Sequence, residues 1–278
     1  MIPGLAFTWH VPAIVALVVA YVVFRSFATT RRRHFEIVGV LAAAAAVLLW
    51  PMGNLAQSVS LSAAVVQRLV LMILVVPVLV ASVPTGVVER LTRPRLVDAV
   101  TYQLARPVVA MLFVTFVGTM TLMPVTIDWA AHSWFGNAVV IVATVIAGVV
   151  LWVPALSVLP GARHLSPAGR AGYVFVSALV VTSFSFIWIL ATHSLYPGLN
   201  GQEAILGVSA VFDQQFAGFL AKLGSYFPMW AISFAIFLKA DAAEHSTEES
   251  PLHWADVERH LLRVDRQRKR AQRRATST

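Results

Sequence analysis

The chain has 278 residues, of which 58% are hydrophobic and only 12% are charged, and its formal net charge is +8. This balance excludes an ordinary water-soluble domain and is typical of a protein that faces lipid. The basic residues stand between apolar runs and at the C-terminus, so they indicate membrane topology and exclude nucleic acid as a partner. The sequence contains no cysteine, which excludes disulfides, thiolate metal sites and a cysteine nucleophile.

Apolar runs long enough to form membrane-spanning helices recur along the chain. A helix that rises about 1.5 Å per residue needs about 20 residues to cross about 30 Å of hydrocarbon. The sequence predicts seven such spans, with approximate limits of 11–27, 35–50, 61–83, 105–125, 137–159, 171–191 and 209–238. We therefore expect an all-α integral membrane protein in which residues 1–241 form a bundle of about seven transmembrane helices.

The loops between these spans differ in charge. The loops that follow the odd-numbered spans carry Arg25, Arg31, Arg32, Arg33, Arg90, Arg93, Arg95, Arg106, Arg163 and Arg170. The loops 51–60, 126–136 and 192–208, which follow the even-numbered spans, contain no Lys or Arg. Because basic loops stay in the cytoplasm, we predict an N-terminus outside, a C-terminus in the cytoplasm and a multi-pass protein of the plasma membrane.

Residues 242–278 are expected to form a basic cytoplasmic tail. Ser250 and Pro251 are typical of a helix start, and apolar residues then recur at spacings of three and four, at Trp254, Val257, Leu261 and Val264. This pattern predicts an amphipathic helix. The helix either lies on anionic lipids of the inner leaflet or is a solvated segment that only sets the orientation of the chain.

Arg68, Asp213 and Lys222 are ionisable side chains that lie inside the predicted spans. Such groups are costly in hydrocarbon and usually face the interior of a bundle. Arg68 and Asp213 both fall in the outer half of the membrane, and we predict that they form an ion pair, which either serves a function or only fixes helix packing. Lys222 is nine residues beyond Asp213, on the opposite face of the helix, and the sequence offers it no acidic partner.

Soft metal ligands gather toward the predicted outer side, and they include Met52, Met120, Met123, His10, His132 and His193. Thioether and imidazole groups suit Cu(I) when thiolates are absent. Met120 and Met123 share a helical face, an arrangement that also serves simple packing. No motif of a metalloprotease, nucleotide-binding loop or catalytic triad occurs, so the sequence does not indicate an enzyme.

Three local sequence blocks are distinctive. One joins Leu195-Tyr196-Pro197 to Ser209, Asp213-Gln214-Gln215, Ala217 and Gly218, and the others are Leu151-Trp152-Val153-Pro154 and Gln67 followed by an apolar run to Pro77. These blocks resemble those of the polytopic CtaG family of cytochrome c oxidase assembly factors. The resemblance implies a non-catalytic membrane factor for assembly or maturation of a haem-copper oxidase, with oxidase subunits and the lipid bilayer as partners and a link to copper centre formation.

The chain departs from this family at the residues thought to handle copper. The block of histidine and methionine that opens the third span in the family reads here Ala64, Val65, Val66, Gln67 and Arg68. Further family histidines correspond to Leu122, Asn137 and Ile141, and Lys222 replaces a residue that is usually aromatic. A copper site of the family type is therefore not carried over.

The polar cluster that remains consists of Arg68, Asp213, Gln67, Gln214, Gln215 and Lys222. One hypothesis is that a metal site has become a structural ion pair. The alternative function is a small transporter or channel-like subunit in which Arg68, Asp213 and Lys222 line one polar path. Convergence of the three charged groups on one cavity would favour that alternative.

Overall fold

The computed structural model describes residues 7, 9–159, 165–199 and 207–248. Within these ranges every regular element is a helix, which confirms the predicted all-α class. Helices suit a bilayer because their backbone groups are satisfied within the segment. The predicted tail helix from Ser250 and the loop residue Arg163 lie outside the described residues.

The first helices in chain order are α1 (Val11–Arg25), α2 (Arg31–Leu48), α3 (Met52–Asn54), the π-helix η1 (Leu55–Val59), α4 (Leu61–Leu69), the π-helix η2 (Val70–Val75), α5 (Val76–Ser82), α6 (Thr85–Thr92) and α7 (Arg95–Leu104). They are followed by α8 (Pro107–Thr121), α9 (Pro124–His132), α10 (Trp134–Leu156), α11 (Pro167–Val181), α12 (Ser185–Leu190), the 3₁₀-helix η3 (Pro197–Leu199) and α14 (Ala210–Glu248). Backbone contacts divide the chain into two units, residues 1–236 and 237–278, and the bundle belongs to the first.

Several of these helices are long and apolar enough to cross a membrane. In the described part of the chain four segments meet that requirement, namely Leu61–Ser82, Trp134–Leu156, Pro167–Leu190 and Ala210–Ala242. Two bent pairs raise the number to six if each counts as one span: α2 with Met52–Val59, bent by 56°, and α7 with α8, bent by 90°. Helix α1 is apolar but shorter, at 15 residues.

Three of the predicted spans are not the continuous α-helices that the sequence suggests. The third changes to π-helix at η2, between α4 and α5. The fourth begins only at Pro107, which starts α8, and it ends at Thr121, so that α9 is a separate short helix. The sixth is broken between Val181 and Ser185. Tertiary contacts described below satisfy backbone groups at two of these interruptions.

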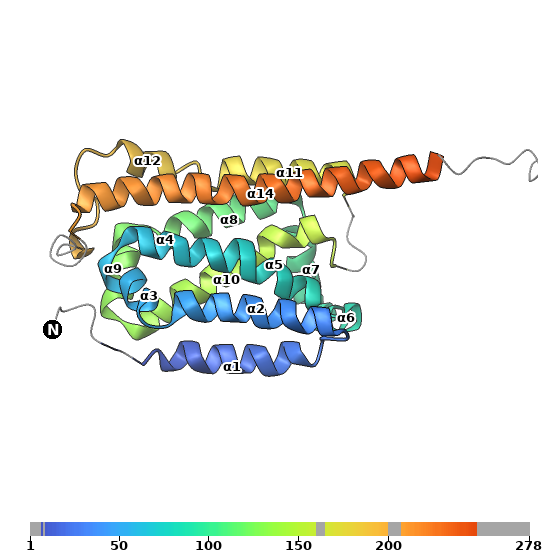
Figure 1. Cartoon of the computed structure of the whole chain (residues 1–278), viewed down its shortest axis with the longest axis horizontal. Coiled ribbons are helices and arrows are strands. Elements are labelled where there is room, and N and C mark those ends of the chain that lie inside the picture. The colour runs from blue at the N-terminus through green and yellow to red at the C-terminus, as the bar shows by residue number, and fades with distance from the viewer. Residues whose placement is uncertain (1–6, 8, 160–164, 200–206, 249–278) are drawn as a thin grey trace, which may run out of the picture. The chain divides into compact units, whose positions relative to one another are not determined.

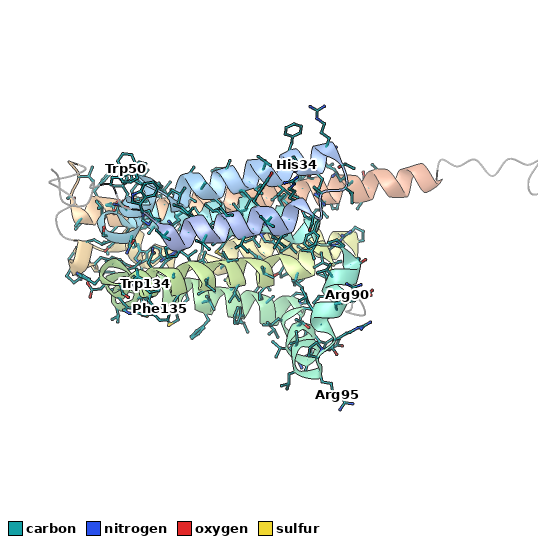
Figure 2. The ribbon with its side chains drawn as sticks, turned by 90° about the horizontal axis from the view of Figure 1, so that it is seen from below. His34, Trp50, Arg90, Arg95, Trp134 and Phe135 are labelled. Atoms are coloured by element: carbon teal, nitrogen blue, oxygen red, sulfur yellow. The ribbon has the colours of Figure 1, made fainter. Side chains whose placement is uncertain are left out.

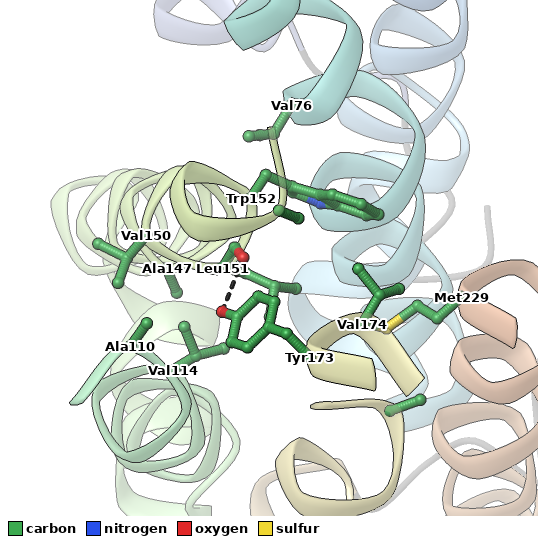
Figure 3. Packing of buried hydrophobic residues seen from close by; sticks show 12 residues of the cluster. Val76, Ala110, Val114, Ala147, Val150, Leu151, Trp152, Tyr173, Val174 and Met229 are labelled. Carbon is green, nitrogen blue, oxygen red and sulfur yellow. Dashed lines mark hydrogen bonds between the residues drawn. The ribbon is translucent and has the colours of Figure 1, made fainter. Parts of the chain in front are cut away.

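The helices of the bundle pack around α10. Figure 1 shows α2 running beside the α4–α5 segment, and contacts link α5 with α2 and with α10, which also contacts α8, α9 and α11. One buried cluster joins five helices through Val76, Ala110, Ala147, Tyr173 and Met229. Figure 3 shows this cluster, with the Tyr173 hydroxyl donating a hydrogen bond of 2.8 Å to the carbonyl of Leu151.

The two ends of the bundle carry different side chains. Figure 2 shows Trp50, Trp134 and Phe135 at one end, and Arg90 and Arg95 at the other, where α6 and α7 leave the bundle. Trp50 is 43% exposed and Trp134 is 70% exposed. Exposed tryptophan at a membrane boundary is typical of an interfacial belt.

Candidate functional site

A buried polar network joins the start of α14 to the start of α4, at the same end of the bundle as Trp134. Asp213 is only 4% exposed, and its carboxylate accepts hydrogen bonds from the Ser60 hydroxyl and from the backbone N–H of Leu61, both at 2.7 Å. The Ser62 hydroxyl donates to the backbone carbonyl of Asp213 at 2.9 Å. Ser60 is the N-cap of α4, so Asp213 places its negative charge at the positive end of that helix.

The predicted ion pair between Arg68 and Asp213 is not formed. In the described part of the chain, the salt bridges join Arg32 and Arg33 to Glu36, and His132 to Asp128. Leu61 begins α4 and Arg68 lies seven residues later, which is about 10 Å along the helix axis. Because Asp213 is held at the first residues of α4, its carboxylate lies about two turns away from Arg68.

Arg68 is itself deeply buried. Arg68 is 8% exposed, and its Nη1 has no hydrogen-bond partner among the described residues. Arg68 lines a cavity whose wall also includes Val65, Leu69 and Met72 of the same segment. Asp213 and Lys222 are not among the residues that line this cavity, so the three charged groups do not converge there.

The three glutamines of the predicted cluster each tie a helix to a neighbouring backbone. Gln67 Nε2 donates to the carbonyl of Val47 at 2.8 Å. Gln214 accepts from the N–H of Leu195 at 2.8 Å, and Gln215 Nε2 donates to the carbonyl of Ala191 at 3.0 Å. The segment 213–215 therefore fastens both the start of α4 and the loop that follows α12.

Lys222 has partners that the sequence did not reveal. Its Nζ donates to the carbonyl of Leu179 at 3.3 Å and lies 3.5 Å from the carbonyl of Thr182, at the break between α11 and α12. The same ammonium lies 4.7 Å from the ring centre of Phe186 and 4.8 Å from that of Tyr226. A cation placed at backbone carbonyls of a helix break, and close to two aromatic rings, is stabilised without an acid.

The soft side chains proposed for copper lie on separate elements. Met120 and Met123 are 37% and 44% exposed, close to the junction of α8 and α9. His132 contacts Asp128 in its own helix, with Nδ1 2.9 Å from the backbone carbonyl, and His193 is an exposed residue of the loop after α12. Met52 packs against apolar clusters near the start of α4. The described residues contain no group of three or more His, Cys, Asp or Glu side chains that would suit a metal ion.

The copper-handling block of the resemblance does not suit a metal ion in this chain. Ala64 and Val65 offer no ligand, and the Gln67 amide is engaged with Val47. Arg68 adds a permanent positive charge at the remaining place, where a cation would be repelled. No step of the function is therefore assigned to copper at this position.

The sequence did not predict Ser60 as a residue of the network, and it placed Tyr196 in a family-like block without predicting its partner. Ser60 is a typical N-cap residue, since its hydroxyl accepts a hydrogen bond of 3.2 Å from the backbone N–H of Ala63, three residues later. Tyr196 is 3% exposed, and its hydroxyl donates to the carbonyl of Leu122 at 2.6 Å. Burial raises the pKa of the Tyr196 phenol, while the Trp188 side chain and the Arg68 charge act in the opposite direction.

Gly218 allows the close approach of α14 to α12. A Cβ at this position would lie 2.9 Å from the carbonyl oxygen of Ser185 and 2.7 Å from Cγ1 of Ile189. Only a residue without a side chain fits between these atoms. Close helix packing therefore explains the glycine at position 218 of the family-like block.

These features define a multi-span, all-helical membrane protein whose buried polar side chains serve mainly helix ends and helix breaks. Residues 20–240 match the family model described as cytochrome c oxidase caa3 assembly factor (Caa3_CtaG). The chain therefore belongs to the Caa3_CtaG family, which confirms the resemblance found in its sequence. No curated protein and no solved structure matches the chain.

Proposed function

We propose that this protein is a non-catalytic membrane factor that supports assembly or maturation of a haem-copper cytochrome c oxidase by binding one of its subunits. The observation that carries the proposal is the family match over residues 20–240, which includes nearly all of the bundle. The internal fastening of α4 and α14 by Asp213 supports a scaffold role, because a stable outer end presents a defined surface to a partner.

The decisive experiment is deletion of the gene, followed by measurement of oxidase haem spectra and oxidase activity in isolated membranes. We expect both to fall, and to return when the wild-type gene is restored on a plasmid. Excess copper in the medium should not replace the protein, because the proposed role does not pass through a copper ion bound by this chain. Unchanged oxidase in all conditions would exclude the proposed function.

A direct contact with the oxidase is the second part of this proposal. Affinity purification of the tagged chain from mildly solubilised membranes should recover a haem-copper oxidase subunit. A matched control is a tagged chain with Asp213→Ala, in which the fastening of α4 to α14 is lost. Recovery of the oxidase at the same level by wild type and by a tagged unrelated membrane protein would argue against specific contact.

We further propose that the protein lies in the plasma membrane, crosses it seven times and has its N-terminus outside. Seven spans result when α1 and both bent pairs are counted with the four long segments. The opposite placement of Trp134 and Arg95 in Figure 2 supports this orientation, because basic residues stay in the cytoplasm.

The absence of native cysteine makes this topology directly testable. Single cysteines introduced at Ser58 and at Ser133 should react with a membrane-impermeant maleimide in intact cells. Cysteines at Thr92 and at Ser166 should react only after the membrane is opened. Labelling of all four positions from the same side would exclude the seven-span arrangement.

The tail from residue 242 onward is proposed to be a cytoplasmic basic domain that lies on anionic lipids. Its sequence contains Arg266, Arg268, Lys269, Arg270, Arg273 and Arg274. Each basic residue near an anionic surface contributes about 1 kcal/mol. A synthetic peptide of residues 249–278 should bind vesicles that contain phosphatidylserine and should dissociate from them at high salt. It should not bind vesicles made only of zwitterionic lipids.

The alternative of a transporter or channel-like subunit is not favoured by the site. That function would place Arg68, Asp213 and Lys222 along one polar path. Instead, Asp213 contacts the start of α4, Lys222 contacts the break after α11, and only Arg68 lines the central cavity. The divergence of the three charges supports the assembly role over transport.

A further inference from the structure

A cavity of about 90 Å³ lies inside the bundle, between the α4–η2 segment, α8, α10, the α11–α12 break and α14. Much of its wall is apolar and includes Leu69, Met72, Leu151 and Met229. A cavity needs only about 15 Å³ to hold one water molecule, so this space admits a small ligand group. Asp213 and the residues that hold it do not take part in this wall.

Arg68 is the one ionisable side chain among the described residues that line the cavity. No described protein group accepts a hydrogen bond from its Nη1, although the residue is more than nine-tenths buried. A buried charge without a partner is strongly destabilising, whereas the same charge with a hydrogen-bonded counter-ion is tolerated. The guanidinium therefore calls for an anionic acceptor inside the cavity.

Within residues 9–159, 165–199 and 207–248, no acidic side chain supplies that acceptor. The carboxylate of Asp213 is taken by Ser60 and Leu61, and Lys222 carries a like charge. Several hydroxyls in the wall donate to nearby backbone carbonyls, as Thr144 does to the carbonyl of Val140 at 2.8 Å. These hydroxyl oxygens can still accept a hydrogen bond through a lone pair, but they are neutral and do not compensate the positive charge of Arg68.

We propose that this cavity binds a carboxylate-bearing ligand, with its carboxylate on the guanidinium of Arg68 and its apolar remainder against Leu69, Met72 and Met229. The planar fork of an Arg side chain matches a carboxylate through two parallel hydrogen bonds. The apolar wall favours a ligand with a hydrocarbon part over a simple halide ion. This inference does not depend on the proposed role in oxidase assembly.

Two residues that line the cavity lie toward the surface of the bundle, one in α8 and one at the α11–α12 break. Phe184, which lines the cavity at the break, is 46% exposed. Gly118 lines it from α8, and a Cβ built at Gly118 meets no atom within 4 Å. Access from this side would admit an amphiphile of the bilayer, such as a fatty acid. A short carboxylate from water, such as acetate, is the other source of the same chemistry.

The test is binding of octanoate and of acetate to the full-length protein, purified in a non-ionic detergent without carboxylates. Equilibrium dialysis with radiolabelled ligand should give one binding site per chain. Arg68→Leu removes the charge, fills the same space and should weaken binding about 10- to 100-fold. In thermal unfolding, saturating ligand should raise the Tm of the wild type but not that of Arg68→Leu.

Gly118→Leu distinguishes the two sources, because it adds bulk on the α8 side of the cavity and leaves Arg68 in place. Octanoate uptake from vesicles that is slower in this variant than in the wild type assigns the ligand to the bilayer, whereas equal uptake rates in the two proteins assign it to the water phase. Arg68→Gln keeps a polar side chain without the charge, and it replaces Arg68→Leu if that variant does not fold. Failure of the wild type to bind either ligand at about 1 mM, or equal binding by the Arg68 variants, would overturn the proposal.

Discussion

Asp213 and Arg68 are both buried ionic side chains, but their surroundings differ in almost every contact. Asp213 accepts two hydrogen bonds at 2.7 Å and lies at the N-terminus of a helix. Arg68, two turns along that same helix, lies against a cavity with no described partner for its Nη1. A buried charge therefore has a structural role where the fold satisfies it, and indicates a ligand where the fold does not.

Lys222 is intermediate between these two residues. Backbone carbonyls and two aromatic rings surround its ammonium, so it is satisfied without a counter-ion. The free energy of unfolding of suitable variants should therefore separate the three groups.

Asp213→Ala should have the largest effect on stability. It removes the acceptor of the Ser60 hydroxyl and of the Leu61 N–H and should lower the free energy of unfolding by about 4 kcal/mol. Thermal or denaturant unfolding of the purified protein measures this loss. Asp213→Asn keeps one accepting oxygen and should lose about half as much.

The same experiment examines the ion pair that the sequence suggested. A double variant with Arg68→Asp and Asp213→Arg should have a free energy of unfolding no higher than that of the less stable single variant, since the two groups do not contact each other. Restored stability in the double variant would contradict the separation of Asp213 from Arg68.

Lys222→Met should lower the free energy of unfolding by about 2 kcal/mol, because it leaves the carbonyl of Leu179 without this donor and removes the contacts with both rings. Leu223→Met is the matched control, since Leu223 is 47% exposed on the same helix. The two variants can be compared by their melting temperatures in one detergent. Equal melting temperatures would show that Lys222 does not stabilise the helix break.

Gly218→Ala should lower the free energy of unfolding by about 1.5 kcal/mol, because its Cβ meets Ser185 and Ile189. Gly172→Ala is the control, since a Cβ there meets no atom within 4 Å, and the change should be neutral or stabilising by up to about 1 kcal/mol. Unfolding curves of the two variants give the difference directly. A more stable Gly218→Ala protein would contradict the close approach of α12 and α14.

Arg68→Leu should act in the opposite direction from Asp213→Ala. In the absence of a carboxylate ligand, replacing an unpaired buried charge by an apolar group should raise the free energy of unfolding by about 1 kcal/mol. Melting temperatures in carboxylate-free buffer measure the change. A loss of stability as large as that of Asp213→Ala would show that Arg68 has a structural partner within the protein.

Part of the site could be predicted from sequence because its signals are local. Asp213, Gln214 and Gln215 stand together in a family-like block, and all three prove to be engaged at one end of the bundle. The partner of Asp213 could not be predicted, because Ser60 lies 153 residues away. The partners of Lys222 could not be predicted either. They are backbone carbonyls of another helix, and every residue has a backbone carbonyl whatever its side chain.

The all-α class, the membrane character and the family can be recognised from the amino-acid sequence, because apolar runs, the uneven placement of arginine and short residue blocks are properties of the chain before it folds. Which spans are interrupted and which charges are satisfied depends on the packing of the helices. A hydrogen bond to a buried charge requires a distance of about 3 Å, and packing between distant parts of the chain sets that distance.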